Sequence, residues 1–202
     1  MFVINIYLKF ALIAVFLGGG IVLTFIYGLV WSWPLLLVGI ILLVSYLMLG
    51  TVASAANMIQ TLDFEGARKR LNLTLSPRLL YVTNRAFYYI MNGSIMMNTG
   101  DTNGAEGEFN KALNLKLPTE NEKGMVLLQL ANINASKNKW NAAKNYYREA
   151  KKLKITEGQL KEQMVQFEKA LTNRGQLKSA QGMGKKGQQM RPGGKRRRPK
   201  MR

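Results

Sequence analysis

The side chains that most often carry out chemistry in proteins are scarce in this chain. Its 202 residues include no cysteine and no histidine. Without thiols and imidazoles, disulfide frameworks, zinc sites built on Cys and His, and catalysis by Cys or His are excluded. A nucleophile and its base would have to be Ser or Thr with Lys, or a pair of carboxylates.

The eleven acidic residues offer little more. We expect them at turns, helix starts and exposed helix positions, where water or the positive end of a helix satisfies a carboxylate. The sequence contains no phosphate-binding loop, dinucleotide fingerprint or metal-ligand spacing. We therefore expect no enzyme activity, no catalytic residue, no cofactor, no bound metal and no small-molecule substrate.

Charge is distributed very unevenly along the chain. There are 29 Lys and Arg against 11 acids, which gives a net charge of +18. Residues 1–57 carry one charged side chain, Lys9, whereas residues 174–202 carry eleven Lys and Arg and no acid. The chain thus divides into an apolar membrane segment (1–57), a mixed segment (58–173) and a cationic tail (174–202). This is not the composition of a soluble single-domain protein.

Two uncharged runs predict a transmembrane hairpin, with spans at about 10–28 and 34–52. A bilayer core of about 30 Å requires about 20 apolar residues of helix, so each run can cross once. Residues 29–33 are then a tight turn, whose two tryptophans favour the membrane interface. Pro34 suits the first turn of the second helix. A signal peptide and a buried soluble hairpin are the alternatives, and both are disfavoured by the length of the runs.

Small residues occur at matching depths in the two runs. Gly18, Gly19 and Gly20 precede the turn by about as many residues as Ser45 follows it. Small side chains let helices approach closely, so this patch is expected to pack the hairpin or a membrane partner.

Basic residues predict the orientation of the hairpin. Lys9 and the segment Arg68–Arg70 lie on one side of the spans, and the turn carries no basic residue. Because positive charge stays on the cytoplasmic side, both termini are expected in the cytoplasm. The short length and the Lys- and Asn-rich middle favour an integral protein of a bacterial plasma or inner membrane.

The mixed segment repeats itself. Three stretches align: DFEGARKRLNLT from Asp63, DTNGAEGEFNKAL from Asp101 and KWNAAKNYYREAKKL from Lys139. Their anchor residues Ala67, Ala105 and Ala143 are 38 residues apart. In the second and third stretches, apolar residues follow the anchor at i+4 and i+7, which makes one stripe of a helix. In the first, Leu71 and Thr74 hold the same spacing more weakly. Further helices are predicted at 51–60, 78–98 and 120–136, so the repeated unit is a helical hairpin.

The repeat resembles the tetratricopeptide family, whose pattern of about 34 residues is W-x2-L-G-x2-Y, then A-x3-F, then Pro. The matching structural positions are Tyr89, Gly93, Ala105, Phe109, Ala112, Pro118, Leu130, Ala131, Ala143, Tyr147 and Ala150. The period of 38 departs from the family, as do Asn92 and Asn134. The expected fold is all-α: a transmembrane hairpin, a short solenoid with a capping helix at 157–171, and a disordered tail.

The resemblance implies a protein-binding groove lined by the first helix of each repeat. The corresponding positions are Phe87, Ile90, Ser94, Met97, Met125, Leu128 and Asn132. None is basic, which disfavours capture of an acidic C-terminus, whereas an apolar groove suits an amphipathic helix. The same side chains could instead simply pack on one another. This interpretation makes the protein a cytoplasmic-face adaptor that recruits a protein partner.

The tail favours polyanions. Its composition predicts disorder, and its predicted anion-binding residues are Lys185, Lys186, Arg191, Lys195, Arg196, Arg197, Arg198, Lys200 and Arg202. Ribosomal RNA and anionic lipid are the two candidate partners. The alternative function is therefore a factor that docks ribosomes or RNA at the membrane during protein biogenesis or insertion.

Overall fold

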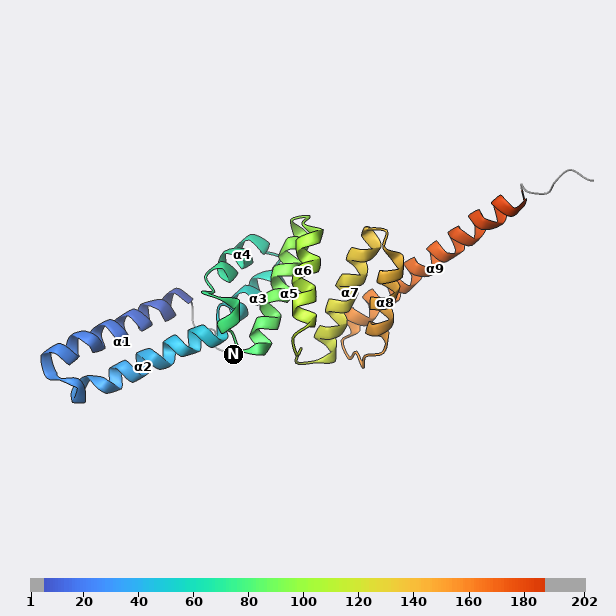
Figure 1. The fold of residues 1–202 in the computed structure, drawn as a ribbon. Helices are drawn as coiled ribbons and strands as arrows, with labels where there is room; N and C mark the ends of the chain where they lie inside the picture. Colours follow the sequence, from blue (N-terminus) through green and yellow to red (C-terminus); the bar gives the residue numbers. More distant parts are fainter. Residues whose placement is uncertain (1–5, 188–202) are drawn as a thin grey trace, which may run out of the picture. The chain divides into compact units, whose positions relative to one another are not determined.

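The computed structural model describes the backbone of residues 6–187 and the side chains of residues 6–174 (Figure 1). Every regular element within that range is a helix, as predicted. The chain forms two units, one ending at Thr156 and the other containing α9 (Gly158–Gly187).

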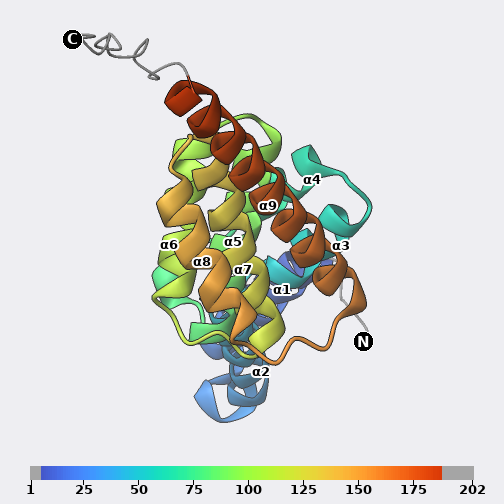
Figure 2. The same cartoon turned by 90° about the vertical axis from the view of Figure 1, so that its right-hand side faces the viewer.

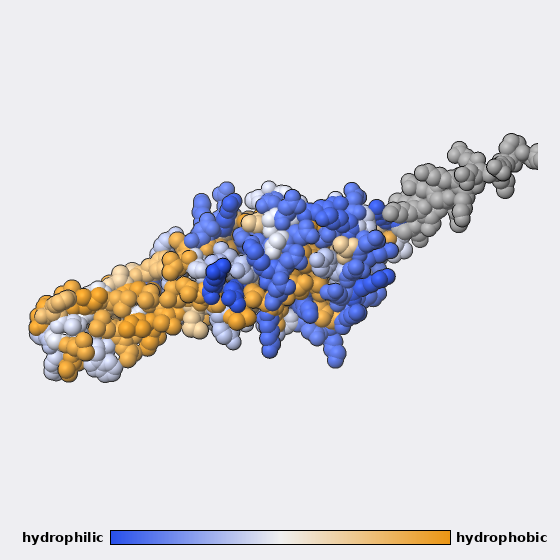
Figure 3. Space-filling view, viewed as in Figure 1, coloured by the Kyte–Doolittle hydropathy of each residue, from blue (hydrophilic) through white to orange (hydrophobic). Residues whose placement is uncertain are grey.

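The first two helices form an apolar hairpin. α1 (Ile6–Tyr27) and α2 (Leu29–Leu49) are both long and apolar enough to cross a membrane. Most of their large side chains are exposed, and on the face shown in Figure 3 hydrophobic residues cover the hairpin while hydrophilic ones gather over the helices that follow. An apolar helix exposed on its outer surface is suited to lipid rather than to water.

The turn of this hairpin differs from the predicted one. It consists of Gly28, with φ +84°, and residues 29–33 already belong to α2. The prediction of a turn at 29–33 was wrong because nothing in that stretch ends a helix, and the Ser32 hydroxyl donates back to the carbonyl of Gly28 at 3.2 Å. Pro34 consequently lies inside α2 instead of in its first turn.

Two glycines set the distance between α1 and α2. A Cβ on Gly20 would lie 2.7 Å from Leu36 Cδ2, and a Cβ on Gly39 would lie 2.6 Å from Leu17 Cδ2. Gly20 therefore packs the hairpin as predicted, whereas a Cβ on Gly18 would meet nothing within 4 Å. The matching depth of Ser45 was wrong, because Leu36 lies opposite Gly20 and the Ser45 hydroxyl accepts from Lys9 Nζ at 3.1 Å. Gly39 was not recognised in the sequence because it stands alone in the second run.

Six further helices follow as three hairpins. Their bounds are α3 Val52–Gln60, α4 Phe64–Asn72, α5 Val82–Asn98, α6 Thr102–Leu113, α7 Glu120–Ser136 and α8 Trp140–Lys151. A 3₁₀ turn, η1 (Pro77–Leu79), precedes α5, which starts at residue 82 and not at 78 as predicted. The helices α5 to α8 run side by side (Figure 2).

The same turn joins the two helices of each hairpin. Leu62, Gly100 and Asn138, spaced by 38 residues, all have positive φ, of 62°, 84° and 60°. In each turn the next residue donates its N–H to a carbonyl five residues back, at 2.8–2.9 Å. This is the bonding of a Schellman motif, which ends a helix with a left-handed residue. The period of 38 read from the sequence is thus a period of the backbone.

The second helix of each hairpin also begins in a related way. Asp63 and Asp101 are N-caps whose side chains accept from the N–H of Gly66 and Gly104, each at 2.8 Å. The third hairpin has Lys139 at this position, without a side-chain cap. Carboxylates at N-caps stabilise helices by about 0.5–2 kcal/mol. The N-termini of α4 and α6 therefore have a stabilising contact that the N-terminus of α8 lacks.

Two apolar clusters run through the stack and share α5. The first joins α3, α4 and α5 through Val52, Ala55, Ala67, Leu71, Leu80, Met91 and Ile95. The second joins α5, α6 and α7 through Ile90, Ala105, Phe109, Ala112, Val126, Leu130 and Ile133. Since α5 buries one face in each cluster, neighbouring hairpins depend on each other for a core.

The boundaries between the segments differ from those predicted. Gly50, with φ +61°, and Thr51 interrupt the chain between α2 and α3, so α3 does not continue α2 as one helix. Val52 and Ala55 belong to the first core, which agrees with the predicted repeat helix at 51–60 but not with a segment boundary at residue 57. The stack therefore begins at α3.

The cationic tail does not begin as predicted. α9 continues to Gly187, so residues 174–187 are helical where disorder was expected. Four of these fourteen residues are glycine, which disfavours a helix, so the local composition does not explain the helix, which simply continues α9. The prediction of a capping role for residues 157–171 stays a prediction.

Candidate interaction surfaces

The residues that carry the repeat resemblance occupy the places where helices meet. Ala105, Ala112, Ala143 and Ala150 are fully buried, and Phe109 fills the space beside Gly93. A Cβ on Gly93 would come within 3.0 Å of the Phe109 ring. Leu130, Ala131 and Tyr147 are buried too, Tyr89 is half-buried and Pro118 is exposed. Apart from Pro118, these side chains pack within the stack.

The predicted groove is only partly accessible. Ile90 and Leu128 are 4% and 1% exposed, so a partner cannot reach them. The half-buried members are Phe87, Ser94, Met97 and Met125, and Asn132 is exposed. The hydroxyl of Ser94 donates to the carbonyl of Ile90 at 2.9 Å within its own helix. Much of this set therefore packs within the stack, which was the second interpretation of the sequence.

A polar cluster joins the start of α6 to the end of α7. Lys137 Nζ lies 2.6 Å from Glu106 Oε2 and 2.6 Å from Asn103 Oδ1. Asn134, only 2% exposed, donates to Glu106 Oε1 at 3.1 Å. The hydrogen bond from Lys137 is the main reason that the pKa of Glu106 is lowered. Sequence reasoning noted Asn134 only as a departure from the repeat pattern, and this buried contact explains the departure.

A second ion pair corrects the expectation for the acidic residues. Glu108 is only 8% exposed and accepts from Lys111 Nζ at 2.6 Å. That hydrogen bond raises the pKa of Lys111, whose ammonium group also lies 5.6 Å from the centre of the Tyr89 ring. Not every acid is solvated, therefore, but Glu106 and Glu108 both have structural partners. Among the residues with described side chains, no three acids form a metal-binding group.

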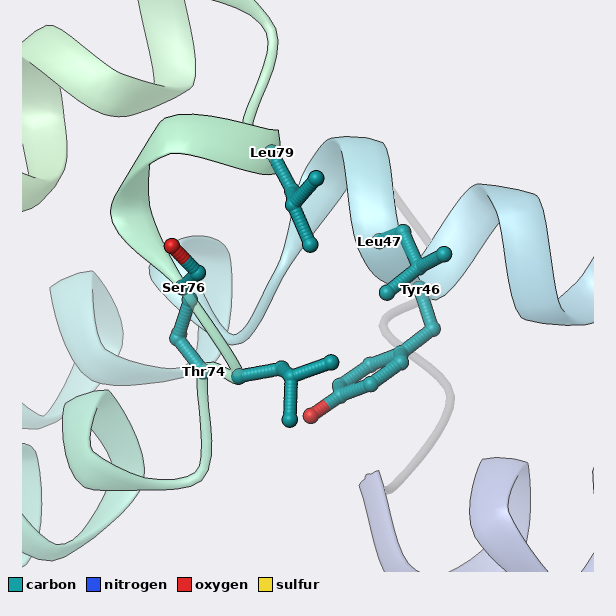
Figure 4. A pocket seen from close by; sticks show the side chains of 6 residues that line it. Tyr46, Leu47, Thr74, Ser76 and Leu79 are labelled. Carbon is teal, nitrogen blue, oxygen red and sulfur yellow. The ribbon is translucent and has the colours of Figure 1, made fainter.

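The end of α2 is bonded closely to the chain after α4. The Tyr46 hydroxyl donates to the carbonyl of Leu73, and Thr51 and Thr74 share a hydrogen bond of 2.9 Å. Thr51 also donates to the carbonyl of Arg70. A small hollow beside this joint is lined by Tyr46, Leu47, Thr74, Leu75, Ser76 and Leu79 (Figure 4).

A second, cationic hollow includes Arg78 of η1. It is open and is lined by Arg78, Arg85, Tyr89, Lys111, Asn114 and Leu115. Arg85 Nε is buried and has no hydrogen-bond partner among the described residues. Three cations against one nearby carboxylate, Glu108, make this hollow attractive to an anion.

The tail residues predicted to bind polyanions are mostly beyond the described chain. Lys185 and Lys186 lie on the backbone of α9. The others, Arg191, Lys195, Arg196, Arg197, Arg198, Lys200 and Arg202, lie outside the described residues.

Comparison with known proteins gives no match to this chain among protein families, curated proteins or solved structures.

Proposed function

We propose that this protein is a membrane-anchored adaptor of the tetratricopeptide type, which recruits a protein partner on the cytoplasmic face. The observation that carries the proposal is the recurrence of one turn at Leu62, Gly100 and Asn138, in helices joined directly to an apolar hairpin. Stacked helical hairpins present extended surfaces for proteins, and an apolar hairpin fixes such a surface at a membrane.

The accessible part of the predicted groove is where the partner would bind. Met97 and Met125 are half-buried apolar side chains on α5 and α7, and Asn132 is exposed beside them on α7. Methionine adapts to differently shaped apolar partners, which suits the capture of an amphipathic helix.

The adaptor proposal is tested by crosslinking in native membranes followed by purification. The full chain is compared with Met125→Glu/Asn132→Glu and with a charge-matched control, Asn141→Glu/Asn145→Glu, whose sites are exposed on α8. We expect the first variant to lose specific crosslinked proteins and the control to keep them. Retention of the same proteins by both variants would remove the groove from the proposal.

The proposed orientation places both termini in the cytoplasm. A reporter fused after Arg202 should be active only on the cytoplasmic side, and a protease added outside intact cells should leave both termini uncut. A reporter active only on the far side would overturn the proposed orientation.

A second candidate function follows from the tail alone. Eleven Lys and Arg with no acid in residues 174–202 favour docking to ribosomal RNA. If six to ten cations contact phosphates, affinity should fall about 10³- to 10⁵-fold between 50 and 200 mM salt. Groove binding is largely apolar and should change little.

Ribosomes and anionic vesicles offered together to the full chain and to a chain truncated after Thr172 distinguish the two anions. Replacing Lys195, Arg196, Arg197 and Arg198 with Gln should weaken ribosome binding if the tail docks RNA. Full recruitment of ribosomes by that variant would leave the adaptor as the remaining function.

A further inference from the structure

The segment between α4 and α5 exposes several large apolar side chains. The exposed fractions are 74% for Leu75, 50% for Leu79, 57% for Tyr81 and 40% for Val82. Single exposed apolar residues are ordinary on a protein surface, but four within eight consecutive positions form a patch. Such a patch marks contact with a membrane or with another molecule.

This segment is fastened to the last turn of α2. The N–H of Tyr81 donates to the carbonyl of Met48 at 2.9 Å, and Asn84 Nδ2 donates to the same oxygen at 3.3 Å. Leu80 is buried against Gly50, where any Cβ would meet its Cδ2. These bonds hold the exposed side chains at a fixed level along α2.

With α2 crossing a bilayer, as proposed, that level lies at the membrane boundary. The 21 residues of α2 span about 32 Å at 1.5 Å per residue, close to the about 30 Å of a hydrocarbon core. Leu47 lies in the last turn of α2, and Leu75 and Leu79 line the same hollow as Leu47 (Figure 4). When α2 crosses a bilayer, these two leucines therefore lie where acyl chains meet headgroups.

The charges beside the patch suit the same surface. Arg78 stands between the two leucines in the chain and is exposed. It lines the cationic hollow together with Arg85 and Lys111, and Arg85 Nε there has no hydrogen-bond partner among the described residues. Arginine pairs with phosphate through two parallel hydrogen bonds, and lipid phosphates lie at this depth.

We propose that residues 75–82 form a third contact with the membrane, beside the two helices of the hairpin. Leu75 and Leu79 enter the acyl-chain boundary, and Arg78 binds the phosphates of anionic lipids. This contact rests on the proposed anchoring by α1 and α2. It fixes the orientation of the stacked hairpins α3–α8 relative to the bilayer, which a hairpin alone would leave free to tilt.

Single-cysteine labelling tests the contact, because the native chain has no cysteine. Leu75→Cys and Leu79→Cys are made in the full chain, labelled with an environment-sensitive fluorophore and reconstituted into vesicles of phosphatidylcholine and phosphatidylglycerol. Lipids carrying a quencher near the headgroup report depth. Ile40→Cys, on the exposed middle of α2, is the control for spanning, and Asn145→Cys on α8 is the aqueous control.

We expect labels at 75 and 79 to be quenched by the lipid quencher and protected from aqueous iodide, with the opposite result at 145. A label at 40 that is shielded from iodide while those at 75 and 79 are not would overturn the contact and leave the anchoring intact. A label at 40 open to iodide would overturn both. Protection at 75 and 79 without quenching by lipid would mean that protein, and not lipid, covers the patch.

The charge is tested with a matched pair of variants. Arg78→Gln in the Leu79→Cys chain should remove the increase of quenching with phosphatidylglycerol content, whereas Arg148→Gln, exposed on α8, should leave it unchanged. An equal response of both variants would show that Arg78 does not bind anionic headgroups.

Discussion

In both the hairpin α1–α2 and the stack α3–α8, helices approach closely where a glycine faces a large apolar side chain. The two regions differ in the polarity of the surface around these contacts. In the hairpin, Gly20 and Gly39 face Leu36 and Leu17 of the opposite helix. In the stack, Gly93 faces the ring of Phe109. The outer surface is apolar around the first pair and largely polar around the second. With the hairpin in lipid, as proposed, glycine contacts would bring helices together in both solvents, but the hydrophobic effect would stabilise only the stack, because it requires water.

The largest effect should come from truncating the apolar side chain on each side of this comparison. Phe109→Ala should cost about 3–5 kcal/mol, since Phe109 is fully buried in a core that excludes water. With the hairpin in lipid, as proposed, Leu17→Ala should cost clearly less, since a leucine there gains only packing. Reversible unfolding of the full chain in mixed micelles, followed separately at each region, measures both. Equal losses of unfolding free energy in the two variants would contradict this difference between the hairpin and the stack.

A smaller effect should appear as pH dependence in the stack only. The pKa of Glu106 is lowered in the folded chain, so its ion pair with Lys137 stabilises the fold above the ordinary value of 4.5 and is lost as pH falls below it. Glu106→Gln should therefore cost about 1–2 kcal/mol at pH 7 and little at pH 3. Unfolding at both pH values checks this, with Glu149→Gln, exposed on α8, as control. A loss that is the same at both pH values would contradict the ion-pair account.

The turns provide the third comparison. Gly28 and Gly100 adopt positive φ with glycine, whereas Leu62 does so with a branched side chain that is 75% exposed. A non-glycine residue in this conformation is strained by about 1–2 kcal/mol. Leu62→Gly should thus stabilise the stack by about 1 kcal/mol, and Gly100→Leu should destabilise it by a similar amount. Thermal unfolding of the two variants measures both effects. A loss of stability in Leu62→Gly would contradict the strain and indicate that the Leu62 side chain makes a stabilising contact.

The smallest effect should come from the polar pair in the hairpin. Thr24 Oγ1 and Ser32 Oγ lie 2.6 Å apart across the turn. Hydrogen bonds between membrane helices contribute about 0.6 kcal/mol on average, so a double-mutant cycle with Thr24→Val and Ser32→Ala should give a coupling of that order. A Thr24–Ser32 coupling energy larger than that of the Glu106–Lys137 pair would contradict the expectation that polar contacts contribute more in the stack than in the hairpin.

Sequence reasoning succeeded where one periodic signal dominated. The apolar runs predicted α1 and α2, and the anchors Ala67, Ala105 and Ala143 predicted the period that the backbone follows in its turns. It failed where two signals competed. The tryptophans and Pro34 suggested a turn at 29–33, but a single glycine provides it. The composition of residues 174–187, with four glycines, suggested disorder, but they continue the helix α9.

The candidate site was harder to predict than the fold. Ile90 and Leu128 have the correct helical spacing for a groove, yet spacing does not tell which neighbour covers a face, and both are buried. The contacts of Tyr46 with Leu73 and of Met48 with Tyr81 join residues about thirty positions apart. No local pattern encodes such a pair. The position of the exposed Leu75 and Leu79 beside the end of α2 therefore could not be predicted from the sequence.

The recurring left-handed turns divide the stack into hairpins of equal length in the sequence. Gly100 and Asn138 occupy equivalent positions, so deleting residues 101–138 would join Gly100 to Lys139 within the same type of turn. Packed helices lie about 8–10 Å apart, and each hairpin therefore adds a fixed increment of length. A chain built this way can be lengthened or shortened by whole hairpins, and the distance between the end of α2 and the last hairpin then changes in steps.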